Sequence, residues 1–179
     1  LMKRDLDRVF NPRSVAVVGD KKDNDYMWLR SLSTFTGKVY SVQIDPQELP
    51  GIERLGIENY SSLLEIPESV DYVVVAVPRS AVPRIVSDCI RKGVGGATIF
   101  TSGFAETNTR EGKDLEDVLA KMAKEADFNI IGPNCMGIFN PKIGIRHDVN
   151  QYHGEAGPVG FISQSGTHAI FFSLVGARN

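Results

Sequence analysis

Continuous runs of apolar, mostly β-branched residues recur along the chain, and turn residues follow most of them. The runs cover residues 15–18, 38–42, 72–77, 97–100, 130–131 and 159–162. A strand that is buried on both faces of a parallel sheet gives such an unbroken run, whereas a half-exposed strand alternates apolar and polar residues. The pattern therefore predicts strands of parallel sheets.

Helical spacing of apolar residues appears between these runs. Residues 81–90 and 115–126 each carry one apolar face, residues 27–35 show a weaker version, and residues 61–64 fit one short helical turn. Alternating strands and helices specify an α/β fold with right-handed crossovers, here a Rossmann-like, doubly wound parallel sheet. Ligands of such sheets bind beyond the carboxyl ends of the strands, so the loops after the strands are the candidate site.

The last fifth of the chain differs in pattern. We expect residues 1–141 to form one domain and residues 142–157, rich in Gly, Pro and polar residues, to form a linker. The run at 159–162 and the helix after it would be the first β-α unit of a second, flavodoxin-like domain spanning 158–179. One strand and one helix bury too little surface to fold alone, so we expect a truncated or a naturally divided protein.

Composition narrows the class of protein. The 179 residues are 42% hydrophobic and 23% charged, with a net charge of −2, which is typical of a globular protein and argues against nucleic acid or an anionic membrane as partner. No apolar run approaches the roughly 20 residues that cross a bilayer. Two cysteines are too few for a disulfide framework or a cysteine-built metal site. Together these features favour the cytoplasm, with no metal bound.

The loops after the first two strands leave alternatives open. The first loop holds Gly19, Asp20, Lys21 and Lys22. It lacks the three-glycine fingerprint of dinucleotide sites. Its lysines could reach a phosphate, or the loop is a solvated turn that caps a helix. After the second strand, Asp45-Pro46 fits either a ribose-binding acid or a common turn.

Three later loops carry further candidates. Arg79 follows Val77-Pro78 and could pair with a phosphate. The stretch 101–106 offers a glycine for close backbone approach and an aromatic side chain to cover a ligand. The stretch 132–137 is a rigid turn between two glycines. The candidate residues of these last two loops are Ser102, Gly103, Phe104, Ala105, Glu106, Asn134 and Cys135.

No catalytic residue is expected within the chain. His147 and His153 lie in the expected linker as exposed or turn residues, and His168 fits a packing or capping role. Cys135 has no recognisable base beside it and fits a buried structural thiol. Ser163 and Ser165 lack the nucleophile elbow of hydrolases, so phosphate binding suits them better.

Taken in order, these motifs resemble the alpha-type portion of the NDP-forming acyl-CoA synthetases, the superfamily of succinyl-CoA synthetase. Gly-Pro-Asn-Cys at 132–135 and Ser-Gln-Ser-Gly at 163–166 are the most specific matches. The supporting stretches extend over nearly the whole chain: 10–19, 37–40, 66–67, 70–71, 77–78, 102–106, 136–137 and 162.

The resemblance implies a domain that binds coenzyme A, followed by the start of a ligase domain. Family members interconvert an acyl-CoA, NDP and phosphate with an acid, CoA and NTP through a phosphorylated histidine. The first four loops would hold CoA, residues 132–135 would lie near its thiol, and a phosphate would meet the helix that follows Ser163, Gln164, Ser165 and Gly166. The phosphorylated histidine and an ATP-grasp domain or subunit are expected outside this chain, and a homo-oligomer stays open.

Two loops depart from the family pattern. Asp20 and Lys21-Lys22-Asp23 replace small residues and a further glycine, and Asp45-Pro46-Gln47 replaces Asn-Pro-Lys, which removes a basic contact to CoA. These departures motivate an alternative, a non-catalytic module that senses CoA or acyl-CoA. A third hypothesis is an NAD(P)-binding oxidoreductase domain, suggested by the fold class and Asp45 but opposed by the missing glycines.

Overall fold

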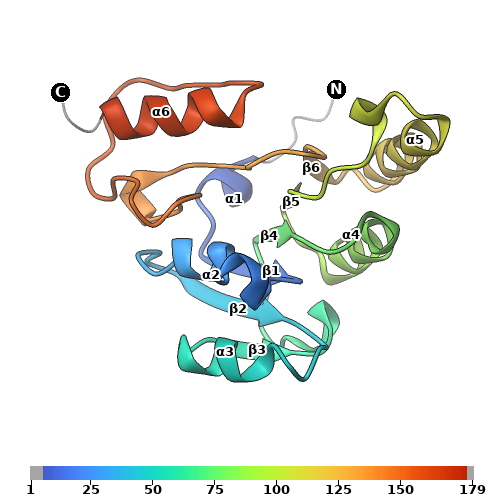
Figure 1. The fold of residues 1–179 in the computed structure, drawn as a ribbon, viewed down its shortest axis with the longest axis horizontal. Helices are drawn as coiled ribbons and strands as arrows, with labels where there is room; N and C mark the ends of the chain where they lie inside the picture. Colours follow the sequence, from blue (N-terminus) through green and yellow to red (C-terminus); the bar gives the residue numbers. More distant parts are fainter. Residues whose placement is uncertain (1–5, 177–179) are drawn as a thin grey trace.

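The computed structural model describes residues 6–176, and its centre is a six-stranded sheet in which every strand pair is parallel (Figure 1). The strands stand in the order β3-β2-β1-β4-β5-β6. Their bounds are Ser14–Val18 for β1, Lys38–Val42 for β2, Glu58–Tyr60 for β3, Tyr72–Val75 for β4, Gly96–Ile99 for β5 and Asn129–Ile131 for β6. The α/β, Rossmann-like class is therefore confirmed.

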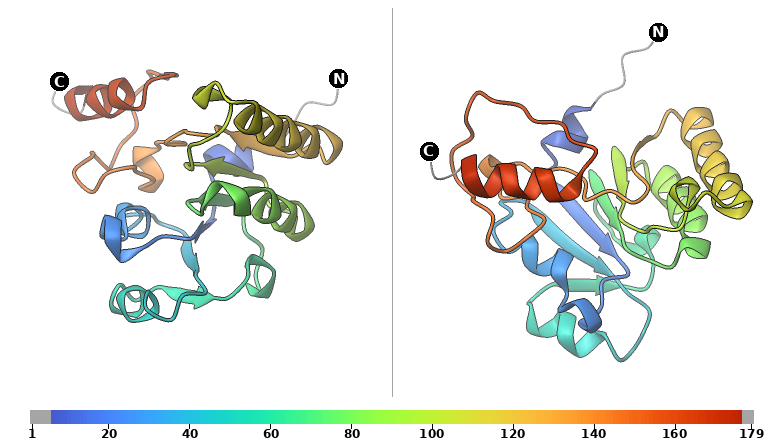
Figure 2. Two further views of the ribbon diagram at one scale, coloured as in Figure 1. Left: turned by 45° about the vertical axis from the view of Figure 1, so that its right-hand side comes forward. Right: turned by 45° about the horizontal axis from the view of Figure 1, so that its top comes forward.

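Helices cover both faces of the sheet. They are α1 (Asp7–Phe10), α2 (Met27–Ser31), α3 (Leu49–Arg54), α4 (Val82–Lys92), α5 (Arg110–Glu125) and α6 (Gly166–Gly176). Short 3-10 turns stand at Lys22–Asn24, Leu63–Glu65, Arg79–Ala81, Ala105–Thr107 and Pro141–Ile143. Figures 1 and 2 show α4 and α5 on one side of the sheet, with α2, α3 and the chain after β6 on the other.

Two apolar cores result, one on each face, because successive strand residues point to opposite sides. Toward α4 and α5, Val18 and Val73 pack with Val86 and Leu119. Toward α2 and α3, strand residues such as Val17 and Val74 pack with Trp28, Leu29, Ile52, Ile138 and Ile145. Strands β1 and β4 are buried on both faces, which explains their unbroken apolar runs.

The structure adds elements that the apolar pattern missed, among them α1, β3 and α3. Strand β3 lies at the edge of the sheet and reads Glu-Asn-Tyr, so it carries no apolar run. Helix α3 contains Pro50 and Gly51, which are poor signals for a helix interior. Gly51 is required there, because a Cβ would lie 2.0 Å from the hydroxyl oxygen of Tyr26.

The strand predicted at 159–162 is wrong for this structure. Residues 159–163 have no regular secondary structure and pair with no strand of the described chain. The side chain of Ile162 is 100% exposed and that of Val159 is 72% exposed. A strand needs a neighbour for its backbone groups, and the described residues supply none beside this run, although the helix expected after it does form as α6.

The linker predicted at 142–157 is also partly wrong, because its first half packs on the domain. Ile145, Arg146, His147 and Gln151 are buried. The amide of Thr36 donates to the carbonyl of Ile143 at 3.0 Å. Within the predicted linker, the chain is continuously exposed from residue 152 onward, and this exposed run continues to residue 162.

Candidate functional site

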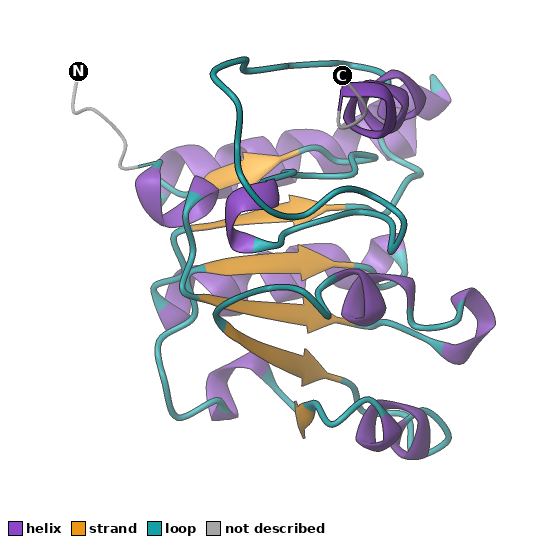
Figure 3. Cartoon of the chain, turned by 90° about the vertical axis from the view of Figure 1, so that its left-hand side faces the viewer, coloured by secondary structure: helices purple, strands orange, loops and turns teal. Residues whose placement is uncertain are grey.

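A cleft of about 440 Å³ opens where the strand order reverses, at the carboxyl ends of β1 and β4. Figure 3 shows the strands running in one direction, so that their carboxyl ends lie along one edge of the sheet. Successive crossovers leave this point in opposite directions, which keeps the loops apart and leaves room for a ligand. Four loops line the cleft, those after β1, β4, β5 and β6. The lining residues are Gly19, Lys21, Asp23, Asn24, Ala76, Val77, Pro78, Phe100, Thr101, Ser102 and Asn134.

Gly19 lets the loops after β1 and β4 approach each other. Its φ is +88°, in the region that favours glycine. A Cβ at this position would lie 2.6 Å from Cγ1 of Val77 and 3.0 Å from the carbonyl oxygen of Ala76. Because Gly19 has no side chain, the loops after β1 and β4 can pack directly against each other at this end of the cleft.

The first loop is fixed by buried polar groups rather than by further glycines. Asp20 is 1% exposed, and its carboxylate accepts the amide of Leu29 at 2.9 Å. Burial is the main cause that raises the pKa of the Asp20 carboxyl. The side chain of Gln43 donates to the carbonyl of Asp20 at 2.9 Å and accepts the amides of Ile44 and Asp45.

Gln43 thus joins the loops after β1 and β2, and the sequence reasoning missed it. Its side chain is buried and uses both its amide nitrogen and its amide oxygen. The available signal was its place directly after β2, where a buried polar residue needs partners from neighbouring loops.

The loops after β4, β5 and β6 are bonded to one another. The hydroxyl of Thr101 donates to the carbonyl of Val77 at 2.7 Å. The amide of Asn134 donates to the carbonyl of Thr101 at 3.0 Å, and that of Cys135 donates to the carbonyl of Ile99 at 3.2 Å. These bonds make one wall of the cleft from three separate strands.

Behind this wall, charged side chains order the loop after β5. The carboxylate of Glu106 accepts the amides of Gly103 at 2.6 Å and Phe104 at 3.0 Å. Arg79 donates to the carbonyl of Gly103 at 2.9 Å and pairs with Glu111 at 2.7 Å. Glu106 and Arg79 therefore hold the loop in place, and neither lines the cleft.

The structure brings together some of the candidate residues and separates others. Gly19, Lys21, Val77, Pro78, Ser102 and Asn134 line the cleft. Candidates outside the lining are Asp20, Lys22, Asp45, Pro46, Arg79, Gly103, Phe104, Ala105, Glu106 and Cys135. Asp45 caps its own turn, since its carboxylate accepts the amide of Gln47 at 2.9 Å. A phosphate contact from Arg79 stays a prediction.

Of the two phenylalanines that follow β5, the one expected to cover a ligand is buried in the core, and the other lines the cleft. Phe104 cannot cover a ligand, because its side chain is fully buried in the core. Phe100, directly after β5, lines the cleft instead and meets Trp28 edge-on with ring centroids 4.9 Å apart. Cys135 is only partly buried, whereas Cys89 is the buried thiol.

The histidines lie away from the cleft. The sequence predicts His147 to be an exposed or a turn residue. It does lie in a bend, but it is not exposed, since it is 5% exposed and meets the rings of Trp28 and Phe139. Burial lowers the pKa of His147 to about 4, so its ring is neutral at pH 7. His153 and His168 are exposed, and the amide of His168 is capped by the hydroxyl of Ser165 at 3.3 Å.

The Ser163–Gly166 turn, with Gln164 between the serines, leads into the N-terminus of α6. The hydroxyl of Ser163 accepts the amide of Ser165 at 3.0 Å. A Cβ on Gly166 would lie 3.0 Å from Cγ of Met136, which follows Cys135 in the chain. The turn therefore sits beside the loop after β6, which also carries the cleft residue Asn134.

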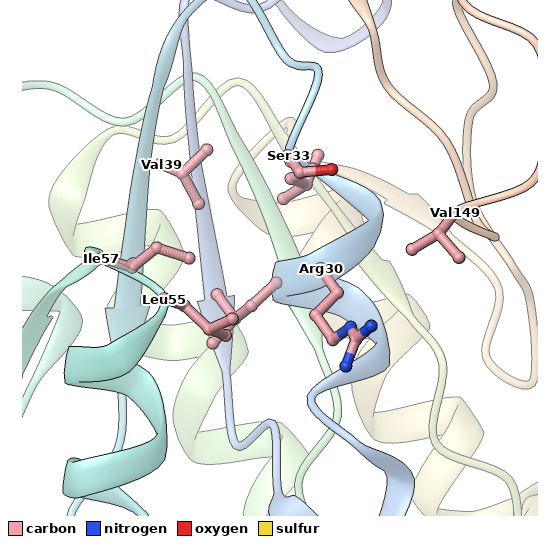
Figure 4. Close-up of a pocket in the computed structure, with 8 residues that line it drawn as sticks. Arg30, Ser33, Val39, Leu55, Ile57 and Val149 are labelled. Carbon is pink, nitrogen blue, oxygen red and sulfur yellow. The ribbon is translucent and has the colours of Figure 1, made fainter.

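A second concavity, of about 450 Å³, lies between α2, β2 and α3 (Figure 4). Its walls are mainly apolar, with Leu55, Ile57 and Val39 on one side and Val149 opposite. The guanidinium of Arg30 lies at this groove and pairs with Asp25 at 2.6 Å. None of the candidate site residues lines it, and it lies away from the strand ends.

Residues 6–176 offer neither a metal centre nor a membrane anchor of the helical kind. No group of three His, Cys, Asp or Glu side chains there is arranged to hold a metal ion. Nor does this part of the chain contain a helix long and apolar enough to span a membrane.

The cleft combines surfaces of two kinds. Ala76, Val77, Pro78 and Phe100 form an apolar wall, while Lys21, Thr101, Ser102 and Asn134 supply a cation and hydrogen-bonding groups. Such a site suits a ligand with a charged end and a less polar, flexible end.

Comparison with known proteins agrees with this chemistry. The profile of a family described as "CoA binding domain" matches residues 13–141. The chain is 39% identical to the alpha subunit of an ADP-forming acetate–CoA ligase II from Pyrococcus furiosus, over 90% of the chain and 35% of that subunit. It is 37% identical to an ADP-forming acetate–CoA ligase I from Archaeoglobus fulgidus, over 92% of the chain and 24% of that protein.

A solved structure extends the likeness to the fold. The dinucleotide-forming acetyl-coenzyme A synthetase 1 of Ca. Korarchaeum cryptofilum, in complex with phosphate and ADP, superposes with a TM-score of 0.79 at 33% identity. The match covers 96% of this chain and 36% of that one. The chain thus spans between about a quarter and somewhat more than a third of the length of these relatives.

Proposed function

This chain belongs to the CoA binding domain family and matches the alpha-subunit region of NDP-forming acyl-CoA synthetases, and we propose that its cleft holds coenzyme A for such an enzyme. The observation that carries the proposal is the meeting of four loops at the switch point of the sheet, with an apolar wall and a lysine at one cleft. The comparisons do not favour a separate sensor module or an NAD(P)-dependent oxidoreductase.

Each wall of the cleft suits a different part of CoA. Lys21 is exposed and lines the cleft, so its ammonium group can pair with a phosphate. The pantetheine arm would run along Val77, Pro78 and Phe100. Its thiol end would approach Asn134 and Cys135, which lie next to the Ser163–Gly166 turn.

That turn is the proposed phosphate site. It leads into α6, and helix N-termini favour anions because their amides and dipole point toward the ligand. The phosphorylated histidine and the ATP-grasp domain or subunit of the proposed ligase would come from other sequence. The acid, CoA and NTP would then give acyl-CoA, NDP and phosphate, and the phosphoryl group would pass close to the thiol end of the cleft.

The test is a calorimetric titration of the full-length protein with CoA. We expect Lys21→Ala to weaken binding about tenfold, since one charge-assisted phosphate contact is lost. Lys121→Ala is the matched control, because Lys121 is an exposed lysine on α5 that pairs with Glu125. No binding to the unaltered protein would refute the proposal. Equal affinities for the two variants would remove Lys21 from the site.

We further propose that the exposed apolar residues near the C-terminal end form the start of a ligase domain. Val159, Phe161 and Ile162 are exposed, and α6 exposes Phe171 and Phe172. The rings of Phe161 and Phe172 stack with centroids 4.2 Å apart, and an exposed apolar surface of this kind marks an interface. Other strands and helices of the same ligase domain would cover it and would pair with residues 159–162.

Hydrogen exchange on the full-length protein tests this second proposal. Amides 159–162 should be protected there to the same degree as those of β4, because both would lie inside sheets. Rapid exchange at 159–162 would show that no strand pairs with them.

A further inference from the structure

Helix α6 turns one buried polar residue and several half-buried apolar residues toward the domain. Of its described residues, Ser173 is the one that is buried, whereas Phe171 is 63% exposed and Val175 is 53% exposed. On the side of Ser173, the apolar residues Ala169, Ile170 and Leu174 are only half-buried, and no described residue of α6 belongs to either apolar core. Apolar packing alone therefore does little to specify where α6 lies. The hydroxyl of Ser173 accepts the side-chain amide of Gln151 at 2.7 Å.

Gln151 itself is fixed on both sides of its amide group. It is 2% exposed, and its oxygen accepts the backbone amides of His147 at 2.7 Å and Asp148 at 3.0 Å. With the bond to Ser173, the buried amide has three partners. A buried side chain whose polar atoms are both hydrogen-bonded favours one geometry, because a shift would leave a buried polar atom without its partner.

Arg146 attaches this segment to α2. Its guanidinium donates to the carbonyl of Ser31 at 3.3 Å and to the hydroxyl of Ser33 at 3.1 Å. It also donates to the carbonyls of Val149 at 2.6 Å and Gln151 at 3.2 Å. A cation suits the C-terminal end of a helix, and these bonds fix Val149 opposite α2 at the groove shown in Figure 4.

We propose that Gln151 is a positioning residue that holds α6, and with it the Ser163–Gly166 turn, in a fixed place relative to the cleft. The inference rests on the proposed function, in which that turn receives the phosphate and the cleft receives CoA. The connection runs from α2, which follows the first loop of the cleft, through Arg146 and Gln151 to Ser173. Without it, the distance between the two sites would depend on the exposed chain 152–162, the contacts at the N-terminus of α6 and the half-buried apolar residues of that helix.

The test compares Ser173→Ala with Ser173→Thr in the full-length protein. Alanine removes the acceptor of the Gln151 bond without harming a helix, whereas threonine keeps the hydroxyl. Ser87→Ala, at a partly buried serine in α4, is the matched control for loss of a helical hydroxyl. The measurements are hydrogen exchange of the α6 amides, the dissociation constant for CoA, and kcat for acyl-CoA formation.

We expect Ser173→Ala to speed exchange in α6 about tenfold and to lower kcat by a similar factor, since loss of one buried hydrogen bond is of that size. Affinity for CoA should stay within about twofold, because the cleft is unchanged. Ser173→Thr should restore both values, and Ser87→Ala should change neither.

Unchanged exchange of α6 in Ser173→Ala would overturn the proposal. So would a loss of CoA affinity as large as the loss of kcat, which would indicate general loosening of the domain. If the unaltered protein fails to bind CoA, the proposed function falls, while exchange of α6 still decides whether Gln151 holds the helix.

Discussion

Gly144 and Gly93 show how differently one residue type constrains a fold. Both are left-handed, with φ of +76° and +72°. A Cβ at Gly93 would meet nothing within 4 Å, whereas one at Gly144 would lie 1.9 Å from the carbonyl oxygen of Thr34. An alanine would have a strained left-handed backbone at either position, but of the two only the one at Gly144 would also collide with a neighbouring atom.

Alanine at the two positions should therefore separate strain from collision. Gly93→Ala should cost about 1 kcal/mol of unfolding free energy, as expected for a left-handed alanine. Gly144→Ala should cost at least about 2 kcal/mol more, because the 141–151 segment must move off α2. Urea unfolding of both variants measures the difference. Equal losses would show that this segment does not pack as the structure has it.

The buried ring of His147 predicts a pH dependence of stability. Its pKa is about 4 in the folded protein and 6.5 for an unperturbed histidine, so the unfolded chain binds the extra proton between these values. Stability is therefore complete above about pH 6.5 and falls as the pH drops toward 4, by roughly 2 kcal/mol at about pH 5.

His147→Phe isolates this effect, because it keeps a neutral ring beside Trp28 and Phe139. Urea unfolding at about pH 7.5 and about pH 5 should show the loss in the unaltered protein and a smaller loss in the variant. His153→Phe, at an exposed position, should keep the original profile. A His147→Phe profile identical to the original would assign the acid sensitivity to other groups.

Single residues were the hardest part of this site to predict. The sequence placed Lys21, Pro78 and Asn134 at strand ends, and they do line one cleft. It could not distinguish Phe100 from Phe104, because both follow β5 and only the path of the loop decides which ring is buried. Nor could it show that residues 143–151 fold back on α2, since those bonds join positions more than 100 residues apart.

At the scale of elements, the first loop of the cleft is held in place by a residue that follows a different strand, β2. Gln43, directly after β2, satisfies the carbonyl of Asp20 and the amides of Ile44 and Asp45. Replacing it by methionine keeps the volume but leaves three backbone groups to find other partners.

We expect Gln43→Met to cost about 2–4 kcal/mol of unfolding free energy and to weaken CoA binding, because the first loop loses its bond to β2. Gln47→Met is the control, at an exposed glutamine of the same loop. Urea unfolding and calorimetry measure the two effects. Full stability together with normal CoA affinity in Gln43→Met would show that the two loops are independent.

Elements with a strong apolar pattern were predicted, and those that depend on partners were not. Strands β1 and β4 read as unbroken valine-rich runs because both faces are buried. Strand β3 needs only backbone bonds to β2 and carries no such run. Residues 159–162 have the run but lack a neighbouring strand in the described chain, so pattern alone was misleading there.

At the scale of the whole molecule, the cleft draws loops from both halves of the sheet. The loop after β1 belongs to the half with β2 and β3, and the other three loops belong to β4, β5 and β6. A ligand that touches all four loops is bound by the native state and not by separated halves. It should therefore stabilise the domain as one cooperative unit.

This argument predicts which cofactor raises the melting temperature. CoA at about 100 times its dissociation constant should add about 2.7 kcal/mol of stability, or roughly 5–10 °C in Tm for a domain of this size. NAD should add little. Its pyrophosphate needs close backbone approach in a glycine-rich first loop, and here the side chains of Lys21, Asp23 and Asn24 line that part of the cleft. Thermal unfolding with each cofactor measures both shifts, and an equal rise with NAD would contradict the assignment of the cleft to CoA.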